Sequence, residues 1–295
     1  MRGMVAGMGL LLASGAAAHA PSGGTATGAW TLSPWLLLPG GLLLALYATG
    51  LVRLWRRAGI GRGLDGGRVA AFLAGIGVLF LALVWPLDAL GAWSLAAHMG
   101  QHMLLLALAP PLLLLGRPLA VWAQALPGPW PGRLHRAGAP AVRHLHLRLA
   151  LATAAHCAVM LAWHLPAATA AALAHEGLHW AMHGSFLLAG LWYWSVLLHG
   201  VRDRQVSVGP GLVSIVAVMM AMGLLGALLV FAPRPLYPVY VERAPMLGLD
   251  ALADQQLAGL VMWIPSALPY LAGGLWLAVL GLRWLDRDAA PGQRP

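Results

Sequence analysis

Seven long apolar runs, separated by short polar segments, follow one another along the chain after residue 34. They lie near Trp35–Val52, Val69–Leu87, His98–Leu115, Leu147–Trp163, Trp180–His199, Ser207–Phe231 and Gln256–Leu280. Each run has roughly twenty residues, the length with which an α-helix crosses about 30 Å of bilayer hydrocarbon. Prolines inside the runs are tolerated as kinks in spanning helices. The pattern predicts an all-α, polytopic membrane protein built as a bundle of seven transmembrane helices.

The first twenty residues resemble a secretory signal. They hold one arginine, an apolar run and small residues ending in Ala18-His19-Ala20, and the run is short for a membrane span. Pro21 would hinder cleavage after Ala20, so cleavage after Ala18 and an uncleaved anchor both stay open. The expected organisation is a signal-like or anchor segment (1–20), an outer linker (21–34), the seven-helix domain (35–281) and a cytoplasmic tail (282–295).

Composition agrees with membrane residence. Of the 295 residues, 60% are hydrophobic and 9% charged, a balance that excludes a water-soluble domain of this length. The net charge of +9 is the difference between eighteen arginines and nine acidic residues, and the chain has no lysine. In a soluble protein it would suggest nucleic acid, but these arginines fall in the loops, so lipid is the expected contact and nucleic acid is not. The single cysteine, Cys157, excludes an intrachain disulfide and a multi-cysteine metal site.

The placement of arginine predicts the orientation of the bundle. Fifteen of the eighteen arginines lie in the first, third and fifth loops and the C-terminal tail, whereas the alternate loops hold Arg234 and Arg243. Because cytoplasmic loops are enriched in Lys and Arg, the odd loops and the C-terminus should be cytoplasmic. The linker after residue 20 should then be outside, which the signal-like N-terminus predicts independently.

Histidines gather at the predicted outer face. His98 and His102 enter the third helix, His164 ends the fourth, and His175, His179 and His183 recur every four residues into the fifth; two acids, Asp88 before the third helix and Asp254 at the start of the seventh, lie at the same level. A spacing of four places side chains on one helix face. Imidazoles are costly to bury in lipid, so such a group indicates function.

The donor types point to a metal ion or a haem. A single interfacial histidine would most simply bond to backbone or lipid, but two four-residue histidine pairs on one side favour a shared ligand. Imidazole suits copper, zinc, iron and nickel alike. Five nearby methionines could add soft ligands for Cu(I), although Met in apolar helices usually packs; they are Met99, Met103, Met182, Met246 and Met262.

His175-Glu176-Gly177-Leu178-His179 matches the H-E-x-x-H signature of zinc proteases. Leu64-Asp65-Gly66 resembles the Asp-Gly element that supplies a third ligand in intramembrane metalloproteases. The predicted topology separates them, because Asp65 belongs to an arginine-rich cytoplasmic loop. An intramembrane protease is therefore a weak alternative.

Several motifs together resemble the caa3-type CtaG family of cytochrome c oxidase assembly factors, over roughly residues 35 to 281. They are His98-Met99-Gly100-Gln101-His102-Met103-Leu104-Leu105, Pro110-Pro111, Gly116-Arg117-Pro118, Trp163-His164-Leu165-Pro166, the helix from His179 to Trp194, Asp254-Gln255-Gln256-Leu257-Ala258-Gly259 and Met262-Trp263-Ile264-Pro265. The matching polar positions are His98, Gln101, His102, His164, His179, His183 and Asp254. His175 and Glu176 fit the pattern less well.

The resemblance implies a multi-pass protein of the bacterial plasma membrane that is needed to mature a haem–copper oxidase, by helping to metallate its copper centre. The expected partner is that oxidase, through its copper-bearing subunit. We expect a non-enzyme that binds copper at the outer face, with His98, His102, His164, His179, His183 and Asp254 as ligands; Asp254 would either ligate or orient an imidazole.

Two further alternatives stay open. One is a membrane haem protein with two histidine axial ligands, which needs imidazoles facing each other across a gap wide enough for a porphyrin. The other is a copper transporter, which needs polar groups that continue through the bilayer. Only His156, near the middle of the fourth helix, offers such a group.

Overall fold

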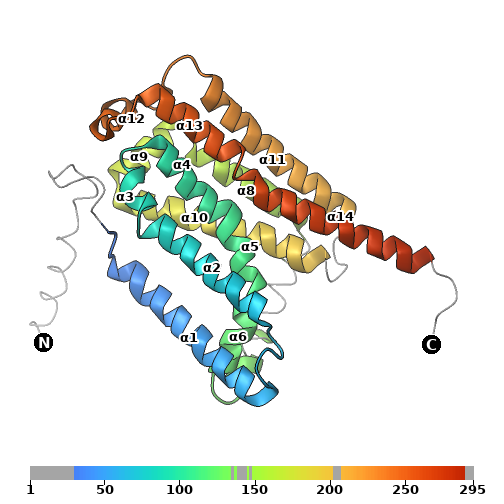
Figure 1. Ribbon diagram of the computed structural model, residues 1–295. Helices are drawn as coiled ribbons and strands as arrows, with labels where there is room; N and C mark the ends of the chain where they lie inside the picture. Colours follow the sequence, from blue (N-terminus) through green and yellow to red (C-terminus); the bar gives the residue numbers. More distant parts are fainter. Residues whose placement is uncertain (1–29, 134–135, 138–144, 146–147, 202–206, 290–295) are drawn as a thin grey trace, which may run out of the picture.

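The computed structural model describes residues 30–133, 136–137, 145, 148–201 and 207–289, and all their regular structure is helical (Figure 1). Six helical stretches are long and apolar enough to cross a membrane, and a bent pair makes a seventh if it is one span. The predicted all-α membrane bundle is confirmed, with six to seven spans. The signal-like segment 1–20, residues 21–29 of the linker and residues 290–295 of the tail lie outside the described part.

The six stretches combine the following helices: α1 (Pro34–Ala58); α2 and α3 (Gly66–Leu83, Leu87–Gly91); α4, the π-helical η1 and α5 (Leu95–Met103, Leu104–Leu108, Ala109–Leu115); α10 and the π-helical η2 (Glu176–Ser195, Val196–Val201); α11 (Val208–Phe231); and α13 with α14 (Ala251–Trp263, Ala267–Ala289). The bent pair is α8 (Leu149–Trp163) and α9 (Pro166–Ala174), which meet at 74°. Shorter helices are α6 (Pro118–Ala125), α12 (Pro238–Arg243) and the 3-10 turn η3 (Ala244–Leu247).

The bend between α8 and α9 is a feature that the apolar pattern did not predict. Proline lacks an amide hydrogen and disfavours helical geometry in the residue before it. Leu165, before Pro166, is accordingly extended (φ −67°, ψ 130°), and Pro166 restarts the helix at its first position. The chain thus turns sharply just after His164, so that this imidazole sits at the end of a helix.

Exposed leucines mark the surface that faces lipid. Leu38 on α1, Leu188 on α10 and Leu275 on α14 are exposed by 73, 68 and 68%. In water, large apolar side chains exposed on so many helices would cost free energy, whereas in hydrocarbon they are in their preferred surroundings. The fold therefore agrees with the membrane character expected from composition.

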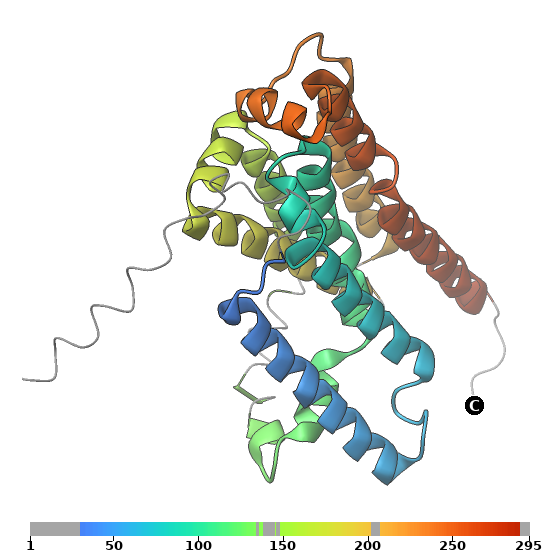
Figure 2. The same ribbon diagram turned by 60° about the vertical axis from the view of Figure 1, so that its left-hand side comes forward.

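The stretch of α4, η1 and α5 lies at the centre of the bundle. It packs against α2, α10 and α13, and α11 then covers α13 and α14. In both views α3, α9 and α12 gather at one end, while the α1–α2 turn, α6 and the C-terminal end of α14 lie at the other (Figures 1 and 2). The predicted histidine-bearing ends thus lie together, away from the arginine-rich first loop. Which end faces outward stays a prediction.

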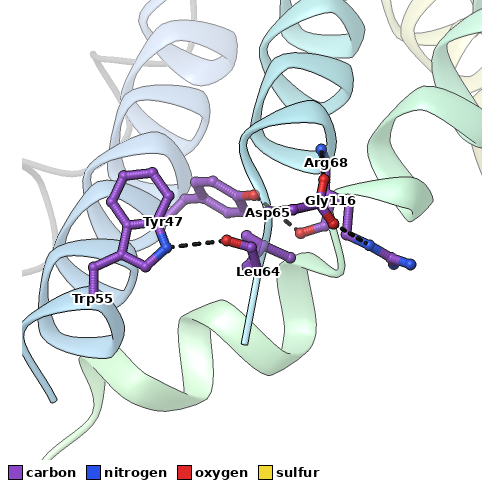
Figure 3. Close-up of polar contacts among 6 residues, drawn as sticks. All are labelled: Tyr47, Trp55, Leu64, Asp65, Arg68 and Gly116. Carbon is purple, nitrogen blue, oxygen red and sulfur yellow. Dashed lines mark hydrogen bonds and ion pairs between the residues drawn. The ribbon is translucent and has the colours of Figure 1, made fainter. Parts of the chain in front are cut away.

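Close contacts at the arginine-rich end hold α1 against the rest of the bundle (Figure 3). The Tyr47 hydroxyl donates to the Gly116 carbonyl and the Trp55 indole to the Leu64 carbonyl, each at 3.0 Å. Asp65 caps α2 through the Arg68 amide and pairs with the Arg68 guanidinium. These bonds, above all that from the Arg68 backbone, lower the pKa of the Asp65 carboxyl.

Candidate metal centre

Five histidines meet at the end of the bundle formed by α3, α9 and α12. We call them the imidazole cluster: His98 and His102 on α4, His164 at the end of α8, and His179 and His183 on α10. None of the five is more than 8% exposed. The cluster brings together every histidine of the predicted site, including the pair on α4 and the pair on α10.

Helical spacing explains the local geometry. Residues four apart lie on the same helix face, and the ring centroids are 4.3 Å apart both for His98 and His102 and for His179 and His183. The pairs face each other. The His98 and His179 centroids are 6.3 Å apart, and those of His102 and His183 are 6.0 Å apart.

His164 completes the cluster from the third direction. Its ring centroid lies 5.3 Å from that of His102. Phe186 of α10 packs against both rings, with centroids 4.3 Å from His102 and 6.0 Å from His164. An aromatic side chain therefore closes the cluster on the side of the bundle interior.

Two of the imidazoles have one ring nitrogen occupied and the other bare. The Nδ1 atom of His164 lies 2.6 Å from the Met160 carbonyl, so this nitrogen carries the hydrogen. The Nδ1 atom of His98 lies 2.9 Å from the Tyr240 hydroxyl, which itself donates to the Gly91 carbonyl at 2.7 Å. Both Nε2 atoms are buried and have no hydrogen-bond partner among the described residues. This is how histidine ligands of metals are usually held.

His102 lies between these two imidazoles. Neither of its ring nitrogens has a hydrogen-bond partner in the described part of the chain, although the ring is fully buried. An unsatisfied buried polar atom costs about 1–3 kcal/mol. His98, His102 and His164 hold four such nitrogens, and because a neutral imidazole has one lone-pair nitrogen, each ring can offer one donor to a bound ion.

Asp88 is the carboxylate closest to the cluster, and sequence reasoning did not select it as a ligand. One carboxylate oxygen accepts from the Gln101 amide at 3.0 Å, and the other from the Thr31 hydroxyl. A donor atom of Asp88, one of His179 and one of His183 all lie within 4.8 Å of one another. Two signals in the sequence could have indicated Asp88: its place just before the helix of His98, in a loop predicted to be outside, and the polar Gln101 three residues after His98.

Asp254, the predicted carboxylate of the site, lies in the first turn of α13. Its carboxylate accepts from the Ser94 hydroxyl and the Leu95 amide, both at 2.6 Å, and from the Ala96 amide at 3.4 Å. It therefore caps α4. In the described residues its hydrogen bonds go to the start of this helix and not to an imidazole, so Asp254 positions the helix that carries His98 and His102.

Two tyrosines that contact the cluster were missed from the sequence. Tyr240 on α12 bonds the His98 ring as described above, and Tyr237, which precedes α12, donates to the His164 carbonyl at 2.6 Å. Burial raises the pKa of both phenols, so both remain hydrogen-bond donors. Nothing in the apolar pattern predicts that the loop before α13 folds back over the histidines.

The H-E-x-x-H residues do not share one environment. His175 and Glu176 are exposed at the start of α10, whereas His179 is buried in the cluster. Asp65 caps the far end of α2, whose eighteen residues span about 27 Å. The geometry gives the protease alternative no assembled site in the described residues.

His156 lies two helical turns further into the bundle on α8. Its Nε2 atom is 2.8 Å from the Tyr270 hydroxyl, and its ring packs on Tyr193 with centroids 4.6 Å apart. Unlike the bare nitrogens of the cluster, this Nε2 atom already has a protein partner. A transport path would have to break that bond.

Comparisons with known proteins agree with this description of the chain. A family model described as "Cytochrome c oxidase caa3 assembly factor" matches residues 45–286, which include the whole cluster. The chain is 27% identical over 263 residues to "Uncharacterized protein Mb0105" of Mycobacterium bovis and, equally, to "Uncharacterized protein MT0111" of Mycobacterium tuberculosis. The match covers 84% of this chain but only 38% of each relative's length. No solved structure matches.

Proposed function

The chain belongs to the family of cytochrome c oxidase caa3 assembly factors, and from this premise we propose that it binds copper in the imidazole cluster and provides it during assembly of the oxidase. Membership in the family implies an association with cytochrome c oxidase and suggests a non-catalytic role. We propose the copper-bearing subunit of that oxidase as the binding partner.

The observation that supports copper binding is the set of bare, buried nitrogens on His98, His102 and His164. A protein that only needed to fill this space would gain about 1–3 kcal/mol for each nitrogen by using apolar side chains. A metal ion removes the penalty for one nitrogen of each imidazole, because Nε2 of His98, Nε2 of His164 and one ring nitrogen of His102 can each donate a lone pair to an ion. Buried imidazoles with unbonded nitrogens are therefore better explained as metal ligands than as side chains that only fill the core.

We assign the five histidines of the cluster as ligands and Asp88 as the carboxylate. Asp88 replaces Asp254 in this role, because a donor atom of Asp88 lies within 4.8 Å of those of His179 and His183, whereas the hydrogen bonds of Asp254 go to the start of α4. The Tyr240 hydroxyl orients the His98 ring from behind, an arrangement that fixes the tautomer and raises the basicity of the ligand. Gln101 likewise orients the Asp88 carboxylate, by donating a hydrogen bond to it from its side-chain amide.

Copper is favoured over the other ions that imidazole binds for two reasons. The client oxidase uses copper, and buried methionines, which carry soft sulfur, lie on α4, α10 and α13. Met99, Met103, Met182 and Met262 are at most 3% exposed, whereas Met246 is 63% exposed. The sulfur atoms pack in the core and provide a polarizable surrounding.

The location of the cluster suits delivery. It lies near one end of the bundle, and His179 is its most exposed member at 8%. With arginine-rich loops in the cytoplasm, this end is the outer face of a bacterial plasma membrane. A protein that hands over its ion there needs ligands close to the aqueous boundary.

Haem is less compatible with the same residues. Two axial histidines must leave a flat macrocycle between them, but His98 and His102 are packed edge to face at 4.3 Å and His102 and His164 at 5.3 Å. The pairs that face each other from α4 and α10 have centroids 6.3 and 6.0 Å apart, but each of these rings has a second imidazole only 4.3 Å beside it on its own helix, which leaves no flat gap for a porphyrin. A single ion or a few ions require no such gap.

A deletion strain tests the proposal. Strains carrying the wild-type gene, the His98→Ala/His102→Ala variant or the His175→Ala control are compared for oxidase activity and for the copper content of the purified oxidase. We expect the double variant to behave like the deletion and the control like the wild type, because His175 is exposed outside the cluster. Normal copper content in the deletion strain would refute the assembly role.

A further inference from the structure

The imidazole cluster and Asp88 offer more donors than one ion can use. A tetrahedral ion takes four ligands, whereas six side chains meet here: the five histidines and Asp88. They also divide into two sets by geometry. The first is Asp88, His179 and His183; the second is His98, His102 and His164.

In the first set the three donor atoms already lie close together. All are within 4.8 Å of one another, and two ligands bound at about 2.0–2.1 Å to one ion are separated by about 4 Å or less. Small side-chain rotations therefore suffice to bind an ion. Gln101 and Thr31 hold the Asp88 carboxylate in place.

The second set is built from different contacts. Backbone carbonyls and Tyr240 occupy Nδ1 of His98 and His164, which leaves their Nε2 atoms as lone-pair donors. His102 lies between them, with ring centroids 4.3 Å from His98 and 5.3 Å from His164. An ion bound to the first set alone would leave these buried nitrogens without partners, at about 1–3 kcal/mol each.

From these two donor sets we propose that the cluster is a two-ion centre. One first-row transition-metal ion binds to Asp88, His179 and His183, and a second binds to His98, His102 and His164. The inference rests on the proposed function, since it assumes that the cluster binds metal. The sets face each other across centroid distances of 6.0 and 6.3 Å, so the ions are neighbours.

The donor chemistry gives the two positions different preferences. The first set carries the charge of a carboxylate, which offsets a divalent ion and weakens its repulsion from the second ion. The second set is neutral and lies against Phe186, surroundings that suit the lower charge of Cu(I). One position thus favours Cu(II) and the other Cu(I).

The metal-to-protein ratio of the full chain tests the proposal. The protein in detergent is loaded with excess copper, desalted and analysed by elemental mass spectrometry. We expect two ions for the wild type, one for Asp88→Asn/His179→Ala, one for His164→Ala and two for the control His175→Ala/Glu176→Ala. A wild-type ratio of one would overturn the two-ion centre and leave the proposed function standing.

Other outcomes are equally decisive. A wild-type ratio of zero would overturn the proposed function itself, and a ratio of two that neither cluster variant lowers would place the ions elsewhere and overturn the two-ion centre. Because a variant can fail to fold, the copper-loaded wild type is also measured by electron paramagnetic resonance after full oxidation, which converts any bound Cu(I) to paramagnetic Cu(II). We expect spin coupling between neighbouring ions, and the signal of one isolated ion would contradict the proposal.

Discussion

The hydroxyl of Ser94 donates a hydrogen bond of 2.6 Å to the carboxylate of Asp254, 160 residues away in the chain. The same carboxylate accepts the amides of Leu95 and Ala96, while the Ser94 hydroxyl accepts that of Ala97. Two backbone amides in the first turn of α4 thus donate to Asp254 of α13, and a third donates to Ser94. A negative charge at a helix N-terminus is also favourable, so the helix that carries half of the cluster depends on Asp254.

Asp254→Asn should destabilise the protein by about 2 kcal/mol, the usual range for a buried hydrogen bond to a charged group. Both carboxylate oxygens accept hydrogens here, and an amide would turn its NH₂ group toward one of these donors. Thermal unfolding in detergent measures the effect. Asp250→Asn is the matched control, because Asp250 caps α13 through one amide at the exposed surface and asparagine is as good a cap. Loss of copper without loss of stability would instead make Asp254 a ligand.

Tyr240→Phe should weaken copper binding by about 10- to 100-fold, the usual effect of removing a group that orients a ligand. The change leaves the ring but removes the hydroxyl that bonds Nδ1 of His98. Tyr237→Phe is the control, since its hydroxyl bonds a backbone carbonyl and no ring nitrogen. Competition with a chromogenic Cu(I) chelator gives both affinities. Equal affinities in the two variants would show that Tyr240 does not act through His98.

Gly50→Ala should destabilise the contact between α1 and α6 by about 1–3 kcal/mol, as overpacking usually does. A Cβ atom there would lie 2.0 Å from the Val121 carbonyl oxygen, which is backbone and cannot rotate away. Gly40→Ala on the same helix meets nothing within 4 Å and should be neutral. Thermal unfolding compares the two, and the copper ratio should be unchanged in both because the contact lies at the end away from the cluster. Equal unfolding temperatures would contradict the tight contact.

Cysteine labelling tests the orientation. In a Cys157→Ser background, Ile60→Cys places a thiol in the α1–α2 turn and Leu249→Cys places one before α13, both at exposed positions. An impermeant maleimide should label position 249 in intact cells, and position 60 only after the membrane is opened. The reverse pattern would invert the topology and put the cluster on the cytoplasmic side.

Much of the fold follows from the sequence because bilayer thickness sets the length of each apolar run. The predicted start of the sixth helix, Ser207, is one residue from the observed Val208. The histidine pairs were found for a similar reason, since a spacing of four has one geometric meaning on a helix. The two histidines on α4 and the two on α10 could therefore be assigned to common helix faces from the sequence alone.

The remaining features depend on contacts that no periodic pattern reports. The fourth apolar run was predicted to end at Trp163, where α8 ends, but the continuation of the chain as α9 depends on packing against α8 and α10. Asp88 and Asp254 look alike in sequence, as acids predicted at the same level near the starts of helices. Only the fold shows that Asp88 lies beside His179 and His183, whereas Asp254 lies at the start of α4. Tyr240 reaches His98 across 142 residues, a distance in sequence that local reasoning does not cover.

The most direct test of copper binding is a Cu(I) titration of the detergent-solubilised protein, wild type against His98→Ala/His102→Ala, with His175→Ala as the control. The double variant removes three of the bare buried nitrogens, whereas the control removes an exposed imidazole outside the cluster. We predict tight binding by the wild type and the control, and loss of that binding in the double variant. Equal affinity in all three proteins would contradict the account.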